Sequence, residues 1–254
     1  MLVTMATSSL KLYALPASHP CAAVEVALHL KSIPYKRVDL LPMTQMLAGP
    51  PLYGGATVPG IRGNGERLVG SRAIMRRLDE LVAEPPLLPP PGDPTYARIL
   101  EIERWGDEVL QSVPRRLIDA GFIRRPDTLE SYAEDAKLPL PRPLLRPAMP
   151  MTARLMAIKN KARDENARAD LLALPSQLDR IDAWIAEGLL GGEQPNAADL
   201  QIGSSIRLMM TIGDVRPLIE GRPCAALARY FPPQVGAIPA GVLPAEWLPA
   251  PAAQ

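Results

Sequence analysis

The chain has 254 residues, 47% of them hydrophobic, and a formal net charge of +1 at pH 7. This length and composition allow one large domain or two ordinary domains with a sizeable core, and they exclude a disordered chain. The near-zero charge excludes the basic surface typical of nucleic-acid-binding proteins, and no apolar run approaches the ~20 residues of a membrane span.

The cysteine and histidine content indicates a cytoplasmic protein without a metal centre. Only Cys21 and Cys224 occur, far apart in the sequence, which excludes a disulfide framework and favours a reducing compartment. His19 and His29 do not give these cysteines a metal-ligand spacing. The first residues, MLVTMATSSL, lack the basic region and long apolar core of a secretory signal. We therefore expect a cytoplasmic protein that binds no metal, no nucleic acid and no membrane.

The first forty residues predict a strand, a helix and a second strand. Residues 10–15 (LKLYAL) form a short apolar strand, and residues 22–30 carry apolar side chains at helical spacing. Pro34 forbids continuation of that helix, and residues 35–41 (YKRVDLL) then predict the second strand. Such a unit gives a parallel strand pair with a crossover helix.

The stretch TVPGIRGNGERLVGSRAI, residues 57–74, predicts a hairpin followed by a helix. Asn64-Gly65 favours a type I′ turn, because that turn needs positive φ at both central residues. Ser71 then stands where it can cap a helix. The apolar face of this helix consists of Ala73, Ile74, Leu78 and Leu81.

Residues 83–94 (AEPPLLPPPGDP) predict a stiff, extended linker. A long helical pattern follows over residues 95–121, with Asp93 as the expected N-cap and Pro94 at the first helical position.

Residues 122–150 are rich in proline and predict irregular structure. Helix resumes over residues 151–167 and continues to residue 187, and Pro175 is expected to kink or split that run. The core-facing stripe of the second part consists of Leu171, Leu174, Leu178, Ile181 and Ile185.

The motif Asn196-Ala197-Ala198-Asp199-Leu200 predicts the start of another helix. An N-cap Asn with an acid three residues later is a variant capping box. The tail after Pro232, rich in Pro, Gly and Ala with a lone Trp247, predicts a loop that covers a neighbouring surface.

Together these elements resemble the cytosolic glutathione S-transferases, in particular serine-type, bacterial-like members. The resemblance rests on LY followed five residues later by Ser18, on IPY before the second strand, and on VP followed by SxAI, and it covers residues 10–83. It implies an α/β thioredoxin-like N-terminal domain followed by an all-helical C-terminal domain. The implied parts are residues 8–84 for the first domain, 85–94 for the linker, 95–231 for the helical domain and 232–254 for the tail.

The resemblance also implies a glutathione site in the first domain. Pro59 is expected to be cis, with Val58 offering its backbone N–H and C=O to the cysteinyl part, and Ser71 is expected to bind the γ-glutamyl carboxylate. The family usually has Glu or Gln before that Ser to meet the γ-glutamyl ammonium, but this chain has Gly70, with Arg72 as a nearby candidate. Gly70→Glu is therefore expected to tighten binding if the rest of the site is standard.

Glutathione transferases stabilise a thiolate, and the N-terminus of a helix favours that negative charge. Ser18, directly before the first helix, is the predicted catalytic residue; the alternative is a simple N-cap. His19 either orients a ligand or is merely packed, and Cys21 is either a buried helix-start residue or the site of a mixed disulfide. Tyr13 is a core-facing strand residue or, as a minor candidate, the thiol-activating hydroxyl.

The acceptor molecule is expected between the domains, against the helix that follows the linker. Trp105 is either a core residue or part of the substrate wall. Arg115 and Arg116 either meet an acidic substrate or lie on a solvated face. The chain is expected to form a homodimer in which Arg76 and Arg77 meet acids such as Glu101 or Glu103 of a second copy.

The predicted function is a glutathione transferase with glutathione as cosubstrate. It would use the thiolate on a hydrophobic or electrophilic small molecule, by conjugation as in detoxification, by isomerisation or by ether cleavage. The alternative is a transferase-fold binding or assembly protein with little catalysis, which Gly70 favours. A glutaredoxin-like reductase is disfavoured because position 18 holds Ser rather than Cys.

Overall fold

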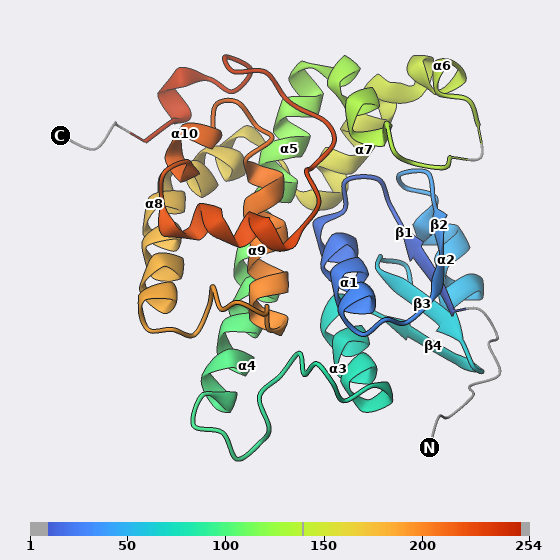
Figure 1. Cartoon of the computed structure of the whole chain (residues 1–254). Coiled ribbons are helices and arrows are strands. Elements are labelled where there is room, and N and C mark those ends of the chain that lie inside the picture. The colour runs from blue at the N-terminus through green and yellow to red at the C-terminus, as the bar shows by residue number, and fades with distance from the viewer. Residues whose placement is uncertain (1–9, 139, 250–254) are drawn as a thin grey trace.

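The computed structural model describes residues 10–138 and 140–249. It shows a small sheet with its helices, in blue and cyan, beside a larger group of helices that forms the rest of the molecule (Figure 1). The predicted start of the first domain at residue 8, residue 139 within the proline-rich stretch and the end of the tail lie outside the described residues.

The sheet has four strands in the order β2-β1-β3-β4. Strand β1 (Leu10–Ala14) pairs in parallel with β2 (Tyr35–Asp39) and antiparallel with β3 (Gly60–Gly63), which continues into β4 (Glu66–Val69). The predicted hairpin turn has φ of 51° at Asn64 and 80° at Gly65, as a type I′ turn requires.

Three helices accompany the sheet: α1 (His19–Leu30), α2 (Gln45–Tyr53) and α3 (Ser71–Leu81). Helices α1 and α3 pack against each other over a core that also contains residues of the sheet and of the helical domain. That core includes Leu12, Val24, Leu28, Ile74, Leu78 and Leu200.

Helix α2 differs from the sequence prediction, which placed no helix between the second and third strands. Its sequence QMLAGPPLY contains Gly49, Pro50 and Pro51, which disfavour a helix on their own. The fully buried Tyr53 anchors its end: its ring lies 5.0 Å from that of Tyr13. Tertiary packing therefore outweighs local propensity here.

The predicted helix over residues 95–121 is present but is divided into three parts. Helix α4 (Tyr96–Trp105) is followed by a short π-helix (Gly106–Leu110) and by α5 (Ser112–Arg124). The helix begins after Thr95 rather than at Pro94, because the Asp93 carboxylate accepts hydrogen bonds from the Thr95 backbone and hydroxyl at 2.7 and 2.6 Å.

The predicted helix over residues 151–187 also divides, but not at Pro175. Helix α7 (Met149–Asn160) ends where Lys161 takes a left-handed conformation, and α8 (Asp164–Ala186) then runs through Pro175. Short helices occupy part of the proline-rich regions. These are α6 (Arg142–Leu145), α10 (Arg216–Ile219) and the 3₁₀ segments Pro126–Ala133, Arg146–Ala148, Pro223–Tyr230 and Ala245–Trp247.

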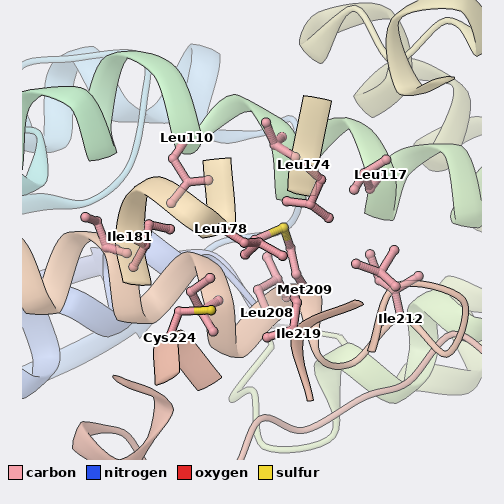
Figure 2. Close-up of a cluster of buried hydrophobic side chains, with 14 of the residues drawn as sticks. Leu110, Leu117, Leu174, Leu178, Ile181, Leu208, Met209, Ile212, Ile219 and Cys224 are labelled. Atoms are coloured by element: carbon pink, nitrogen blue, oxygen red, sulfur yellow. The ribbon is translucent and has the colours of Figure 1, made fainter. Parts of the chain in front are cut away.

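Helix α9 (Ala197–Met209) lies at the centre of the helical domain and begins with the predicted capping box. The Asn196 side chain accepts from the N–H of Asp199 at 3.0 Å, and the Asp199 carboxylate accepts from the N–H of Asn196 at 3.0 Å. The side chains of α9 interdigitate with the predicted stripe of α8 and with residues of α5 (Figure 2).

The tail packs against the helical domain. The Asp214 carboxylate accepts three backbone N–H bonds from Gly241, Val242 and Leu243 at 2.6 to 3.0 Å. Trp247 is buried beneath Arg124, whose guanidinium lies 4.6 Å from the ring centroid. In the part of the chain that the structure describes, no helix is long and apolar enough to cross a membrane.

Candidate active site

A cavity of ≈ 520 Å³ lies between the sheet and the helical domain. The first domain contributes the loop after β1, the segment before β3 and the start of α3, and the helical domain contributes the π-helix, α5, residues 126–133 and α7. A cavity of this size suits a small molecule or a short peptide.

The segment before β3 presents a backbone edge to the cavity. The Val58-Pro59 peptide bond is cis, as predicted, and both residues line the cavity. The N–H of Gly70 donates to the carbonyl of Pro59 at 2.9 Å. No described residue bonds the N–H or C=O of Val58, so both groups are available to an extended peptide ligand.

The start of α3 is the second polar feature of the cavity. Ser71 is the first residue of the helix, where unpaired backbone N–H groups favour a carboxylate. Its hydroxyl donates to Oε1 of Gln201, on α9, at 2.9 Å. The Gln201 Nε2 group is buried and has no partner among the described residues.

Gly70, which also lines the cavity, has φ of +94°. Residues other than glycine have a strained backbone in this region of φ. A Cβ atom at Gly70 would meet nothing within 4 Å, so the space for a longer side chain is open. The expected benefit of Gly70→Glu is therefore opposed by backbone strain, which the sequence did not reveal.

Ser18 lines the cavity at the N-cap position of α1. Its side chain makes no capping hydrogen bond, so capping does not account for the hydroxyl. The hydroxyl lies near the thiol of Cys21 and lowers the pKa of that thiol, against the larger opposing effect of burial. The preceding residue, Ala17, has φ of 57°, a strained conformation of the kind that clusters at functional sites.

The other candidates near Ser18 lie in different surroundings. Cys21 is 1% exposed and outside the cavity lining, and burial raises the pKa of its thiol to about 11, which disfavours a mixed disulfide. Tyr13 is buried against Tyr53 and does not line the cavity. His19 is buried and lines the cavity; burial holds the pKa of its imidazole well below its usual range.

Arg72 and Trp105 lie outside the cavity lining. Arg72 instead faces three acids, with side-chain distances of 3.6 Å to Glu103, 3.8 Å to Asp107 and 3.6 Å to Glu108. Trp105 packs edge-on against Trp184 at 5.1 Å between ring centroids, on the core of the helical domain.

The arginines predicted to meet a partner subunit are paired within the chain. Arg76 donates to both carboxylate oxygens of the buried Glu103, and Arg77 pairs with Glu66 and Glu80. Within the chain Glu103 is buried and already paired with Arg76, so it is not exposed to a second copy; a contact of Arg77 with Glu101 of a second copy stays a prediction.

Several polar residues of the cavity could not be identified from the sequence. Asp107 lines it from the π-helix, Gln111 from the junction with α5, and Asp119 from α5, and Gln201 reaches Ser71 from α9. These residues lie in no recognisable motif, and only the tertiary fold brings them beside the first domain. No cluster of three or more potential metal ligands occurs among residues 10–138 and 140–249.

Residues 12–86 match the family model for the glutathione S-transferase N-terminal domain. No curated protein sequence matches the chain. Among solved structures, a glutathione S-transferase from Rhodospirillum rubrum F11 is 18% identical, with a TM-score of 0.57 over 94% of this chain and 97% of that chain. FzlA from C. crescentus is 19% identical, with a TM-score of 0.54 over 90% and 96%.

A third similar structure is maleylacetoacetate isomerase from Anaeromyxobacter dehalogenans 2CP-1 with bound GSH. It is 20% identical, with a TM-score of 0.52 over 87% of this chain and 89% of that chain. At such identities, likeness to these structures shows the fold alone. The chain therefore has the glutathione transferase fold, a thioredoxin-like domain followed by a helical domain, and the family match to its first domain supports the predicted family.

Proposed function

We propose that the protein is a glutathione-dependent transferase in which Ser18 stabilises the bound thiolate. One observation carries the proposal: Val58, Ser71 and Ser18 line a single cavity between the two domains. The free backbone edge of Val58 fits the cysteinyl part of the tripeptide, and Ser71 at the start of α3 fits the γ-glutamyl carboxylate. The Ser18 hydroxyl stands at the N-terminus of α1, where a thiolate is favoured.

The bond from Ser71 to Gln201 is compatible with carboxylate binding. A hydroxyl has one proton to donate, and here the acceptor is Oε1 of Gln201. Rotation of the Gln201 amide by about half a turn would bring its unpartnered Nε2 group to Ser71 as a donor. The Ser71 proton is then free for the ligand, and the Gln201 Nε2 group gains Ser71 as an acceptor.

We propose that Asp107 replaces the missing acid before Ser71. Its carboxylate lines the cavity together with Gly70 and Ser71, and it lies 3.8 Å from Arg72, the residue after Ser71. Gln111 also donates to it at 2.6 Å, which holds the carboxylate in place. The γ-glutamyl ammonium would then be bound by the helical domain instead of the residue before α3.

The Ser18 hydroxyl would act as a hydrogen-bond donor to the sulfur. In the structure the hydroxyl lies near the Cys21 thiol, whose raised pKa of about 11 keeps it protonated at neutral pH. A glutathione thiolate is a stronger hydrogen-bond acceptor than that thiol, because a hydrogen bond to a charged group is stronger than one between neutral groups. The chemistry that bound glutathione supplies is nucleophilic attack by sulfur on the second substrate.

A second candidate function is a binding or assembly protein of the same fold. Gly70 favours it, because the contact usual at that position is missing. Isothermal titration with glutathione, followed by turnover of chlorodinitrobenzene and a panel of other electrophiles, separates the two. Binding with turnover supports the enzyme, binding without turnover supports the second function, and no binding at tens of millimolar glutathione contradicts both the site and the enzyme.

We further propose that the protein acts in the cytoplasm as a homodimer. Its two cysteines are unpaired and buried, which suits a reducing compartment. Helix α2 exposes Met46 and Leu47, the latter 87% exposed, so this surface offers apolar area to a second copy.

A further inference from the structure

A polar cluster that the proposed glutathione contacts do not explain lines the cavity, mostly from the helical domain. Its members are His19 at the start of α1, Arg115 and Asp119 on α5, and Lys159 and Asn160 on α7. They come from α1, α5 and α7, whereas the proposed contacts to the tripeptide come from the segment before β3, the start of α3 and the π-helix. Gln111 connects the two groups, because it donates to Asp107 and accepts from Arg115. A cluster next to the proposed tripeptide contacts is a candidate for binding the second substrate.

Two buried atoms in this cluster have unused hydrogen-bonding capacity. Asp119 is 0% exposed; its Oδ2 accepts from Asn160 at 2.7 Å, and its Oδ1 has no partner among the described residues. His19 is 2% exposed, and its Nε2 likewise lacks a partner among the described residues. Buried polar groups are normally satisfied, so a polar ligand group is expected to complete this region.

Arg115 supplies a positive charge that no carboxylate neutralises directly. Its guanidinium donates to the side chain of Gln111, and in the described part of the chain it forms no ion pair. The adjacent Arg116 provides a contrast, because it pairs with Asp170 at 2.6 Å and does not line the cavity. Lys159 adds a second cation to the same lining.

Asp119 carries only part of a negative charge at neutral pH. Burial raises the pKa of this carboxyl to about 7, against the opposing effects of Asn160, Arg115 and Lys159. The carboxyl is therefore protonated in a large fraction of molecules and can donate a hydrogen bond from Oδ1.

We propose that the second substrate carries a carboxylate, which binds between Arg115 and Asp119. This proposal rests on the proposed glutathione function and names the substrate class of the same cavity. The guanidinium donates to the carboxylate, and the protonated Asp119 donates to its other oxygen. Apolar residues also line the cavity, Ile118, Phe122 and Met156 among them, so a substrate with an apolar body and an acid at one end fits it.

The observations favour a carboxylate over a phosphate monoester. A phosphate dianion places a second negative charge beside Asp119, so it would be repelled by that carboxylate whenever the carboxylate is ionised. A carboxylate brings one charge and two oxygens, which match one guanidinium and one O–H donor.

The test compares ligands that differ only in charge. Titration calorimetry with wild-type protein uses S-methylglutathione, S-(carboxyethyl)glutathione and its neutral counterpart S-(carbamoylethyl)glutathione, each acid and amide also in a longer-chain version. In a second experiment, NMR measures the binding of pentanoate and of pentanamide in the absence of glutathione. We expect the acid to bind about tenfold more tightly than the amide in at least one pair.

Variants then assign the preference. Arg115→Gln should abolish the preference for the acid, whereas Arg116→Gln, the matched control on the next residue, should retain it. Thermal unfolding of both variants checks that they are folded, and the comparison of acid with amide in wild-type protein needs no variant.

The outcomes separate this proposal from the proposed function. If S-methylglutathione fails to bind but pentanoate binds in an Arg115-dependent manner, the glutathione function is wrong and the anion site stands. If S-methylglutathione binds but no acid exceeds its amide, the anion site is wrong and the glutathione function stands. A preference for the acid that survives Arg115→Gln also overturns the proposal.

Discussion

Asp107→Asn is expected to weaken glutathione binding about tenfold. A charge-assisted hydrogen bond contributes roughly 1.5–3 kcal/mol, and each 1.4 kcal/mol is about tenfold in affinity. The side chain of Asp107 is 33% exposed, so solvent screening places the effect at the lower end of that range. The measurement is calorimetric titration with glutathione at neutral pH.

Glu108→Gln is the matched control for this substitution. Its carboxylate lies 3.6 Å from Arg72, as close as that of Asp107, but it does not line the cavity. Loss of this charge should leave the dissociation constant of glutathione nearly unchanged, because only a carboxylate in the cavity can meet the ligand.

Gly70→Glu should then restore binding in the Asp107→Asn background. The side chain enters open space, but φ of +94° at this position costs folding stability, about 1–3 kcal/mol for a strained residue. Gly70→Ala carries the same strain without the carboxylate, so the difference between the two variants isolates the new contact. Thermal unfolding of the free protein measures the strain separately.

Two results would refute this reasoning. If Asp107→Asn binds glutathione as tightly as wild type, the ammonium is held elsewhere. If Gly70→Glu restores no more binding than Gly70→Ala, the ammonium does not lie beside the start of α3, and the placement of glutathione along this edge fails.

Ser18→Ala should lower conjugation turnover roughly 10²–10³-fold while glutathione binding stays nearly intact, since the hydroxyl acts on sulfur; full turnover with any accepted electrophile would remove Ser18 from the mechanism. Gln201→Glu should weaken glutathione binding in titrations, because a carboxylate can only accept from Ser71 and adds negative charge near the ligand carboxylate, whereas unchanged affinity would show that this contact is not used. Between pH ~4 and pH ~7 the Asp119 carboxyl is protonated in the folded chain but ionised in the unfolded chain. The free energy of unfolding therefore falls as pH rises through that window, by about 1.4 kcal/mol per unit of pKa shift. His19, facing Arg115, has the opposite sign, so the test is the difference between wild type and Asp119→Asn in urea unfolding at several pH values, and a difference that does not vary with pH contradicts the assignment. Light scattering with size exclusion should give twice the 27.5 kDa mass of one chain, and a mass of one chain that is unchanged by dilution or salt would exclude the homodimer.

Elements whose defining residues lie within a few positions of one another can be predicted from the sequence. The turn at Asn64-Gly65 and the capping box at Asn196 depend on residues within a few positions of each other, and the structure confirms both. The fold class follows from the order of these elements, and it is confirmed as well.

Elements set by distant contacts could not be predicted in this way. Helix α2 exists despite Pro50 and Pro51 because Tyr53 is buried against the sheet, and the break between α7 and α8 falls at Lys161 although Pro175 is the stronger local breaker. The same holds for the site: nothing near Gln201 or Asp107 in sequence indicates that either lies beside the start of α3.

The two halves of the cavity differ in how strongly their residues restrict which ligand can bind. The first domain offers mostly backbone groups, at Val58 and at the start of α3, and such groups remain whatever side chains the sequence carries. Their presence therefore indicates the fold and a general ability to bind an extended peptide, but it does not choose a reaction. The helical domain offers side chains, with Asp107 proposed for the ammonium and Arg115 with Asp119 proposed for an acid, and each proposed contact depends on one residue at one position. Because those side chains can be exchanged without altering the fold, they determine which molecule this cavity accepts, and substitutions there test function more directly than substitutions in the motifs that identify the fold.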